Sequence, residues 1–286
     1  MANNQVTVYS STASQWAGVP LLGLAEKDMK EDEYKIEEID LFGGENFHPD
    51  YVKINPNGTI PSLTTKSLPK PLVDSTEILN YLDQRLAGTS LTPIDTRTRE
   101  VMQRLIGLVH SDQMGTNLIL LHARNKEEME KKQSSMWNEF LRNRQAKLEK
   151  YGGENPELDA FYKPRIRMNG AVNKLYNSPV GEDHQTFFTQ SDAMFRDFAA
   201  GLQQLDSLLV LPYAAGDELT LADLHIIPWL SHAMWGAGGS QVTDFEPLEK
   251  LLQISDHGFT IGAKIKLWWS KVGERESFKK CFPVLH

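Results

Sequence analysis

The chain has 286 residues, of which 40% are hydrophobic and 24% are charged, and its formal net charge is −8. These values are ordinary for a soluble globular protein, and the length can bury one large core or two modest ones. The negative balance disfavours a nucleic-acid-binding surface, because phosphate binding requires an excess of Lys and Arg. It also gives no reason to expect binding to an anionic membrane.

Cysteine usage and the termini favour a cytoplasmic protein. Cys281 is the single cysteine, so an internal disulfide is impossible and a reducing compartment is expected. The N-terminus lacks the basic residues and apolar run of a signal peptide, and no apolar stretch approaches the ~20 residues that cross a bilayer. The eight histidines show no metal-ligand spacing, so no metal is expected.

The first 87 residues alternate between strand and helix patterns. Ala17, Leu21 and Leu24 share one helical face, although Pro20 should perturb that helix by removing a backbone donor. The elements follow the order βαβαββα, which is that of a thioredoxin-like domain. They are a strand at 6–9, a helix at 14–29, a strand at 34–41, a short helix at 48–55, a hairpin of 62–66 with 68–73, and a helix at 75–87.

A polar break that begins at Gly88 predicts a linker over residues 88–97, and the remaining residues, 98–286, show only helical patterns. The Gly152-Gly153 pair should end the second of these helices. The fold class predicted is therefore an α/β thioredoxin-like domain (1–87) followed by an all-α helical bundle. The expected helices span 98–124, 126–150, 156–177, 186–210, 219–235 and 258–271.

Two adjoining motifs are the most informative part of the sequence. They are NPNGTIPSL, which begins at Asn55, and LVDSTEILNYLD, which begins at Leu72. Together they resemble the glutathione-binding half of cytosolic glutathione transferases, in which an NPxGx(V/I)PxL segment precedes an (E/Q/D)SxxIxxYL helix. Further on, Thr220 and Asp223 form the capping signal of that family's helical domain. Trp268 begins a segment similar to its WxxxVxxRPSFK tail, with Glu276 in place of the proline.

The resemblance implies glutathione as co-substrate and attack of its thiol on a small hydrophobic electrophile. The sulfur needs a hydrogen-bond donor near a helix N-terminus, because an ordinary thiol is mostly protonated at neutral pH. Ser14 lies five residues after Tyr9 and thirteen before Lys27, which matches the serine-type classes. Ser11 is the next candidate. A plain N-cap role is the alternative for Ser14.

The remaining glutathione contacts implied by the resemblance lie in the two motifs. Ile60 should offer its backbone to the cysteinyl part, with Thr59 before it and a cis Pro61 after it. Asp74 and Ser75 should hold the γ-glutamyl end, although a plain helix cap is the alternative for this pair.

Two departures from the family pattern remove positive charge from around this anionic ligand. Thr59 stands where a long polar or basic side chain usually reaches the glycyl carboxylate. Val19 stands where the first helix usually carries Arg or Lys.

An acceptor pocket would lie between the two domains. Trp16 in the first helix and His110, Met114 and Asn117 in the second domain are candidates to line it. Residues 125–185 are longer than the family norm and have no expected place. The resemblance further implies a homodimer that acts in detoxification or secondary metabolism.

Two alternatives to the transferase reading stay open. One is a glutathione-dependent isomerase, ether-cleaving or sulfur-donating enzyme, and the other is a non-catalytic scaffold or regulator. The direction of the Ser14 hydroxyl, towards the ligand or back into its own helix, should discriminate the catalytic from the non-catalytic reading.

Overall fold

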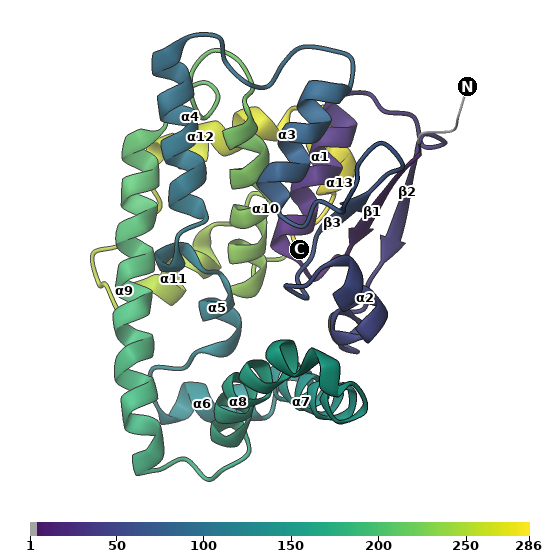
Figure 1. The fold of residues 1–286 in the computed structure, drawn as a ribbon. Coiled ribbons are helices and arrows are strands. Elements are labelled where there is room, and N and C mark those ends of the chain that lie inside the picture. The colour runs from purple at the N-terminus through teal and green to yellow at the C-terminus, as the bar shows by residue number, and fades with distance from the viewer. Residues whose placement is uncertain (1–4) are drawn as a thin grey trace.

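The computed structural model describes residues 5–286. An N-terminal α/β region stands beside a larger helical region, and α9 (Gln185–Leu208) runs along the side opposite the sheet (Figure 1). The pair α7 (Met136–Glu154) and α8 (Asp159–Tyr176) lies below α2 (Pro49–Ile54) in this view. The predicted fold class, an α/β region followed by a helical bundle, is confirmed.

The sheet has three strands in the order β2–β1–β3. β1 (Val6–Ser10) pairs in parallel with β2 (Tyr34–Glu38) and antiparallel with β3 (Ser62–Thr64). The second arm of the expected hairpin is reduced to one bridge, in which Leu63 and Leu72 exchange backbone hydrogen bonds of 2.8 and 2.9 Å. Pro69 and Pro71 explain this correction, because neither residue has an amide hydrogen for a ladder.

Helices α1 (Gly18–Glu26) and α3 (Ser75–Arg85) cover one face of the sheet. Val8, Leu24 and Ile78 belong to the core that forms between them. Pro20 lies in the first turn of α1, where its missing amide hydrogen costs no intrahelical bond. The residues before it, Gln15–Ala17, form a separate 3-10 turn rather than part of the predicted helix.

The helical region is built around α10 (Leu221–Gly236), which is buried on all sides. The predicted capping box is confirmed, since Asp223 accepts from the Thr220 amide at 2.8 Å and Thr220 donates its hydroxyl to the same carboxylate at 3.0 Å. Trp268 also donates its indole N–H to Asp223, at 2.7 Å. The remaining helices of this region are α4 (Thr96–Val109), α5 (Asn117–Leu121), α6 (Lys126–Gln133), α11 (Glu246–Gln253), α12 (Ala263–Gly273) and α13 (Glu276–Cys281).

Several predicted helix boundaries were wrong. The helix expected at 98–124 breaks at His110, and the one expected at 126–150 breaks where Ser135 caps α7 by accepting from the Trp137 amide at 3.2 Å. Helix α7 runs through Gly152-Gly153 and ends before Pro156. The contact of α7 with α8 stabilises the end of the helix and offsets the low helix propensity of the two glycines. The short helices α11 and α13 were not predicted separately.

We expect Gly153→Ala to raise the free energy of unfolding by about 0.5 kcal/mol, because a helical alanine loses less chain entropy than glycine. A Cβ at Gly153 meets nothing within 4 Å. The matched variant is Gly152→Ala, whose Cβ would lie 3.0 Å from Cβ of Tyr162. Chemical denaturation should show a gain for the first variant and none for the second. Equal gains would contradict close packing of α7 on α8.

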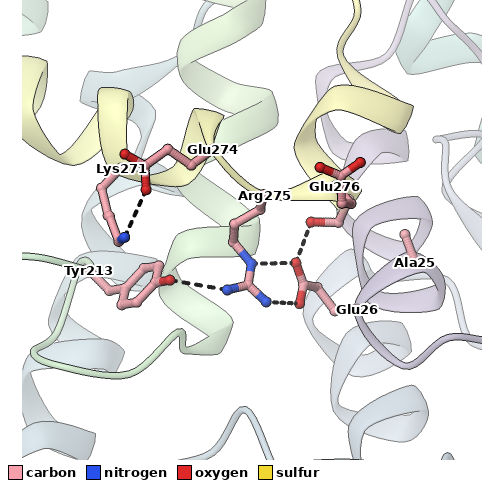
Figure 2. Close-up of a pocket in the computed structure, with 8 residues that line it drawn as sticks. Ala25, Glu26, Tyr213, Lys271, Glu274, Arg275 and Glu276 are labelled. Carbon is pink, nitrogen blue, oxygen red and sulfur yellow. Dashed lines mark hydrogen bonds and ion pairs between the residues drawn. The ribbon is translucent and has the colours of Figure 1, made fainter.

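An ion pair joins the two regions at the C-terminal end of α1 (Figure 2). Arg275 donates to both carboxylate oxygens of Glu26, at 2.7 and 2.5 Å, and to the hydroxyl oxygen of Tyr213 at 3.1 Å. The Glu26 side chain is only 8% exposed. Nearby, the buried Lys27 and Asp83 form a second pair at 2.6 Å, where Asp83 also accepts from the linker amide of Leu91.

Replacing Glu26 by Gln should lower the free energy of unfolding by about 2 kcal/mol, because it leaves the partly buried Arg275 without its counter-charge. The control is Glu31→Gln, which breaks an exposed 3.5 Å pair with Lys280 at the same helix, α13. Surface pairs contribute little, so the control should behave as wild type. If thermal or urea unfolding gives the two variants the same free energy of unfolding, this account is contradicted.

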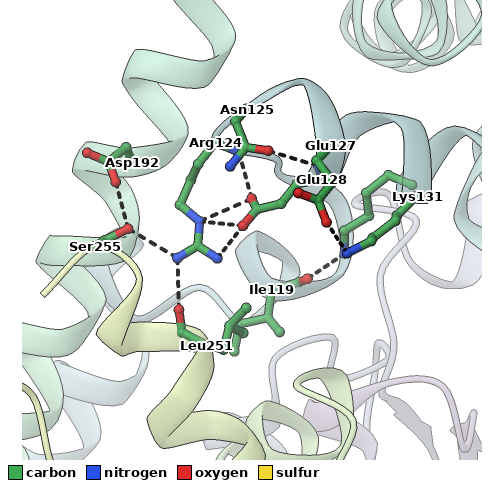
Figure 3. A network of polar contacts seen from close by, with 10 residues as sticks. Ile119, Arg124, Asn125, Glu127, Glu128, Lys131, Asp192, Leu251 and Ser255 are labelled. Atoms are coloured by element: carbon green, nitrogen blue, oxygen red, sulfur yellow. Dashed lines mark hydrogen bonds and ion pairs between the residues drawn. The ribbon is translucent and has the colours of Figure 1, made fainter. Parts of the chain in front are cut away.

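A second polar network fixes the base of the α6–α8 segment (Figure 3). Arg124 donates to Glu128 at 2.6 Å, to the Leu251 carbonyl at 2.8 Å and to the Ser255 hydroxyl at 3.1 Å. Its guanidinium lies 4.1 Å from the ring centre of Phe195 in α9. The start of α6 is thus held against α9 and α11.

Within residues 5–286, no helix is both long and apolar enough for a membrane span. The same residues contain no group of three or more His, Cys, Asp or Glu side chains placed to hold a metal ion.

Candidate functional site

A cavity of about 390 Å³ lies between the α/β region and the helical region. The α/β region contributes Ser14 and Ile60 to its wall. The helical region contributes Asn117 and residues of α7 and α8. The lining residues are Ala13, Ser14, Gln15, Trp16, Leu41, Phe42, Asn46, Phe47, Asn57, Gly58, Thr59, Ile60, Asn117, Leu120, Leu121, Trp137, Phe140, Arg144, Arg165 and His232.

The Ser14 hydroxyl points across to the cis-proline loop. Ser14 precedes the 3-10 turn Gln15–Ala17, but its side chain makes no capping hydrogen bond to that turn. It donates instead to the Ile60 carbonyl oxygen at 3.2 Å. The plain N-cap alternative therefore does not describe Ser14.

The loop that carries Ile60 is held in place by buried side chains. The Ile60–Pro61 peptide bond is cis, as predicted. Tyr51 donates its hydroxyl to the Thr59 carbonyl at 2.7 Å, and Asn55 donates to the same oxygen at 2.7 Å. Burial raises the pKa of the Tyr51 hydroxyl to about 12, so it stays a donor at neutral pH. Ile60 itself is buried, whereas Thr59 is exposed.

Asp74 and Ser75 lie at the start of α3 and do not line the cavity. Asp74 caps the helix, because its Oδ1 accepts from the amides of Thr76 at 2.9 Å and Glu77 at 3.1 Å. Both bonds use the same oxygen, which leaves Oδ2 of this exposed side chain able to accept from a ligand. Ser75 is 4% exposed.

The candidate pocket residues are placed differently from one another. Trp16 and Asn117 line the cavity. His110 stands behind Trp16, with the two rings stacked at 3.9 Å, and its Nε2 lies 3.0 Å from Nδ1 of His225. Met114 is fully buried in the main core, where its carbonyl accepts from the Trp229 indole at 2.7 Å.

Of the predicted pocket residues, His110 and Met114 therefore do not line the cavity: His110 stacks on Trp16, and Met114 belongs to the core. Ser11, the second hydroxyl candidate, is buried and does not line the cavity.

Helices α7 and α8 supply a wall that the sequence did not place. Trp137, Phe140 and Arg144 come from α7, and Arg165 comes from α8. Arg165 donates to the carbonyls of Phe161 at 2.9 Å and Asn57 at 3.0 Å. No sequence pattern marks these arginines, because Arg on a charged helix usually belongs to a solvated face.

Two buried polar atoms on the wall have no hydrogen-bond partner among the described residues. They are Oδ1 of Asn46 and Nδ1 of His232, and both side chains are 3% exposed. Burial, together with the nearby His286, lowers the pKa of His232 to about 4, so the imidazole is neutral at pH 7. Buried groups without partners are uncommon and suggest a polar ligand.

Comparison with known proteins decides the family. A model of the glutathione S-transferase N-terminal domain matches residues 13–85. The Arabidopsis thaliana protein glutathione S-transferase Z1 is 30% identical over 190 residues, which cover 61% of this chain and 82% of that protein. The chain belongs to the glutathione transferase family.

Several solved structures also resemble this one. The β-etherase LigF from Sphingobium sp. strain SYK-6 superimposes with a TM-score of 0.63 at 18% identity, covering 97% of this chain and 98% of LigF. A glutathione transferase homologue from Sulfitobacter, with bound glutathione, gives 0.59 at 15% identity and covers 96% of each chain. At these identities the likeness establishes the fold alone.

We expect Gly58→Ala to destabilise the protein by about 2 kcal/mol and to weaken ligand binding, because Gly58 has a φ of +60° and its Cβ would lie 2.6 Å from Cζ of Phe161. Gly238→Ala is the control, since Gly238 has a φ of +97° and open space around it. Melting temperature and glutathione affinity together test this. If both variants lose equal stability, α8 does not pack rigidly on this loop.

Proposed function

We propose that the protein is an active glutathione transferase in which the Ser14 hydroxyl stabilises the glutathione thiolate. The observation that carries this proposal is the direction of the hydroxyl, which points away from its own turn and donates to the Ile60 carbonyl on the same wall of the cavity. That carbonyl is the group that the family resemblance assigns to the cysteinyl part of glutathione. A bound cysteinyl N–H would take over the carbonyl, and the serine hydroxyl would then turn to the neighbouring sulfur.

The chemistry requires only a thiolate and an acceptor. A hydrogen bond from Ser14, before the first turn of the Gln15–Glu26 segment, lowers the thiol pKa. The thiolate sulfur forms a bond to an electrophilic carbon of a small hydrophobic acceptor. The leaving group departs with its electron pair, and the thiol proton passes to solvent. Trp16, close to Ser14, and Asn117 of the helical region line the cavity and would contact this acceptor.

Glutathione would lie along the edge of the α/β region. Ile60, beside the cis Pro61, would pair with the cysteinyl backbone, and Thr59 would face the glycyl end. The free Oδ2 of Asp74 would accept from the γ-glutamyl amine, while the α3 N-terminus at Ser75 would attract the carboxylate. We further propose a homodimer in the cytoplasm, with the division at residues 87 and 98 as predicted.

An ether-cleaving reaction is the second candidate. The β-etherase LigF shares this fold and motivates the candidate. The glutathione thiolate, stabilised by Ser14, would attack the carbon of an ether, and the alkoxide that leaves would take a proton from solvent to become an alcohol. The α7–α8 wall, which belongs to the long 125–185 segment, would suit a specialised substrate of secondary metabolism.

We expect Ser14→Ala to lower kcat/KM with 1-chloro-2,4-dinitrobenzene by about 100-fold, as does loss of one transition-state hydrogen bond elsewhere. Glutathione should still bind by isothermal titration, but ultraviolet titration of the bound thiolate should give a higher thiol pKa. The control is Ser11→Ala, which should retain wild-type values for both. Unchanged activity and thiol pKa in Ser14→Ala would reject the proposal, and so would a wild type that binds no glutathione.

A further inference from the structure

Arg144 carries a positive charge that the described protein does not balance. Its guanidinium lies 4.7 Å from the ring centre of Phe47 and 5.1 Å from that of Phe140. No carboxylate among residues 5–286 comes within 4.0 Å of it, in contrast to the paired Arg124 and Arg275. Burial, together with the neighbouring Arg165, lowers the pKa of Arg144 to about 10, so the group stays charged at pH 7.

Arg165 adds a second cation to the same wall. Its two hydrogen-bond acceptors are the neutral carbonyls of Phe161 and Asn57, so its charge is not cancelled either. Two like charges in one cavity repel each other, and partial burial increases their cost. An arrangement of this kind is stabilised when an anion enters between aromatic walls and the guanidinium groups.

The surroundings of Arg144 point to the kind of anion. Phe42 packs against Trp137 at 5.8 Å and Phe140 at 5.2 Å between ring centres, so the wall beside the cation is aromatic. Asn46, whose buried Oδ1 has no hydrogen-bond partner among the described residues, also lines this cavity. A planar guanidinium can donate two parallel hydrogen bonds to one carboxylate. Neither an aromatic ring nor a single water molecule can accept such a pair of bonds.

We propose that Arg144, with Arg165 beside it, forms a carboxylate-binding subsite that α7 and α8 add to the thiol site. Arg144 is the direct partner of the carboxylate. Arg165 adds positive potential while it holds the Asn57 carbonyl. The proposal rests on the proposed function, because it assumes that glutathione and an acceptor share this cavity with Ser14.

The carboxylate could belong to either of two ligands. The aromatic wall favours an acidic aromatic acceptor, whose ring would pack against Trp137 and Phe140. The alternative source is the glycyl end of glutathione, since Thr59 supplies no positive charge there. Both ligands present the same group to Arg144, and chemical removal of that group from each one separates them.

The first experiment measures binding of two acceptor analogues in the presence of S-methylglutathione, which cannot react. The probes are 4-chloro-3,5-dinitrobenzoate and the corresponding benzamide. Wild type should bind the acid about 10- to 100-fold more tightly than the amide, as for charge-assisted pairs. Arg144→Met should lose that preference while its affinity for the amide changes little.

The second experiment repeats the comparison with glutathione and its glycyl monoethyl ester. A preference for glutathione that disappears in Arg144→Met assigns the subsite to the glycyl carboxylate. If Arg144→Met keeps the preference for glutathione but loses the preference for the acid in the first experiment, the subsite is assigned to the acceptor. If neither preference depends on Arg144, the proposal is overturned.

Arg142→Met is the matched control, because Arg142 is an exposed arginine of the same helix that does not line the cavity. It should keep every wild-type preference. Melting temperature provides a readout besides ligand binding. Loss of an unbalanced charge should leave the melting temperature of Arg144→Met equal to or above that of wild type. A marked decrease with unchanged ligand preferences would assign Arg144 a structural role instead.

These outcomes separate the subsite from the proposed function. If wild type binds glutathione but does not distinguish acids from their neutral analogues, the subsite fails and the transferase site stands. If Ser14→Ala keeps full activity while Arg144 still selects carboxylates, the assignment of Ser14 fails and the subsite stands.

Discussion

The docking of α8 on the loop around Gly58 is the constraint on which the site depends. Phe161 packs where only a glycine leaves room, and Tyr162 donates its hydroxyl to the Phe47 carbonyl at 2.7 Å. Ile60 lies two residues beyond Gly58 and accepts the Ser14 hydrogen bond. One loop therefore positions both the thiol site and the wall opposite it, so the cavity cannot change on one side alone.

That coupling gives the α6–α8 segment a role in binding as well as in stability. Arg124 anchors its base against α9 and α11, and Tyr162 anchors its far end against the α/β region. A segment held at both ends positions Arg144, whose guanidinium also lies over the ring of Phe47 on the α/β side. Preorganisation of this kind reduces the entropy lost when a ligand binds. The cavity is thus positive inside a protein whose net charge is −8.

Short motifs in the sequence were informative in both regions. The family resemblance implied the Ile60–Pro61 cis bond, and residue spacing indicated the Asp74 cap of α3 and the Thr220–Asp223 capping box of α10, all of which are present. The α7–α8 wall was not predictable in this way. Its position depends on contacts over more than a hundred residues, such as Tyr162 with Phe47 and Arg165 with Asn57. For the same reason, Met114 could not be recognised as core from helical periodicity alone.

The α7–α8 wall changes how the missing basic residues at Val19 and Thr59 are interpreted. Taken alone, they remove cations from the neighbourhood of an anionic ligand and favour a non-catalytic protein. The structure has two cations in the same cavity, on helices of the 125–185 segment, which had no expected place. Positive charge on α7 and α8 is fixed to the helical region, whereas a basic residue at position 59 would belong to the glutathione side. Moving the charge across the cavity changes which ligand it can select, because a cation opposite the thiol faces the acceptor as well as glutathione.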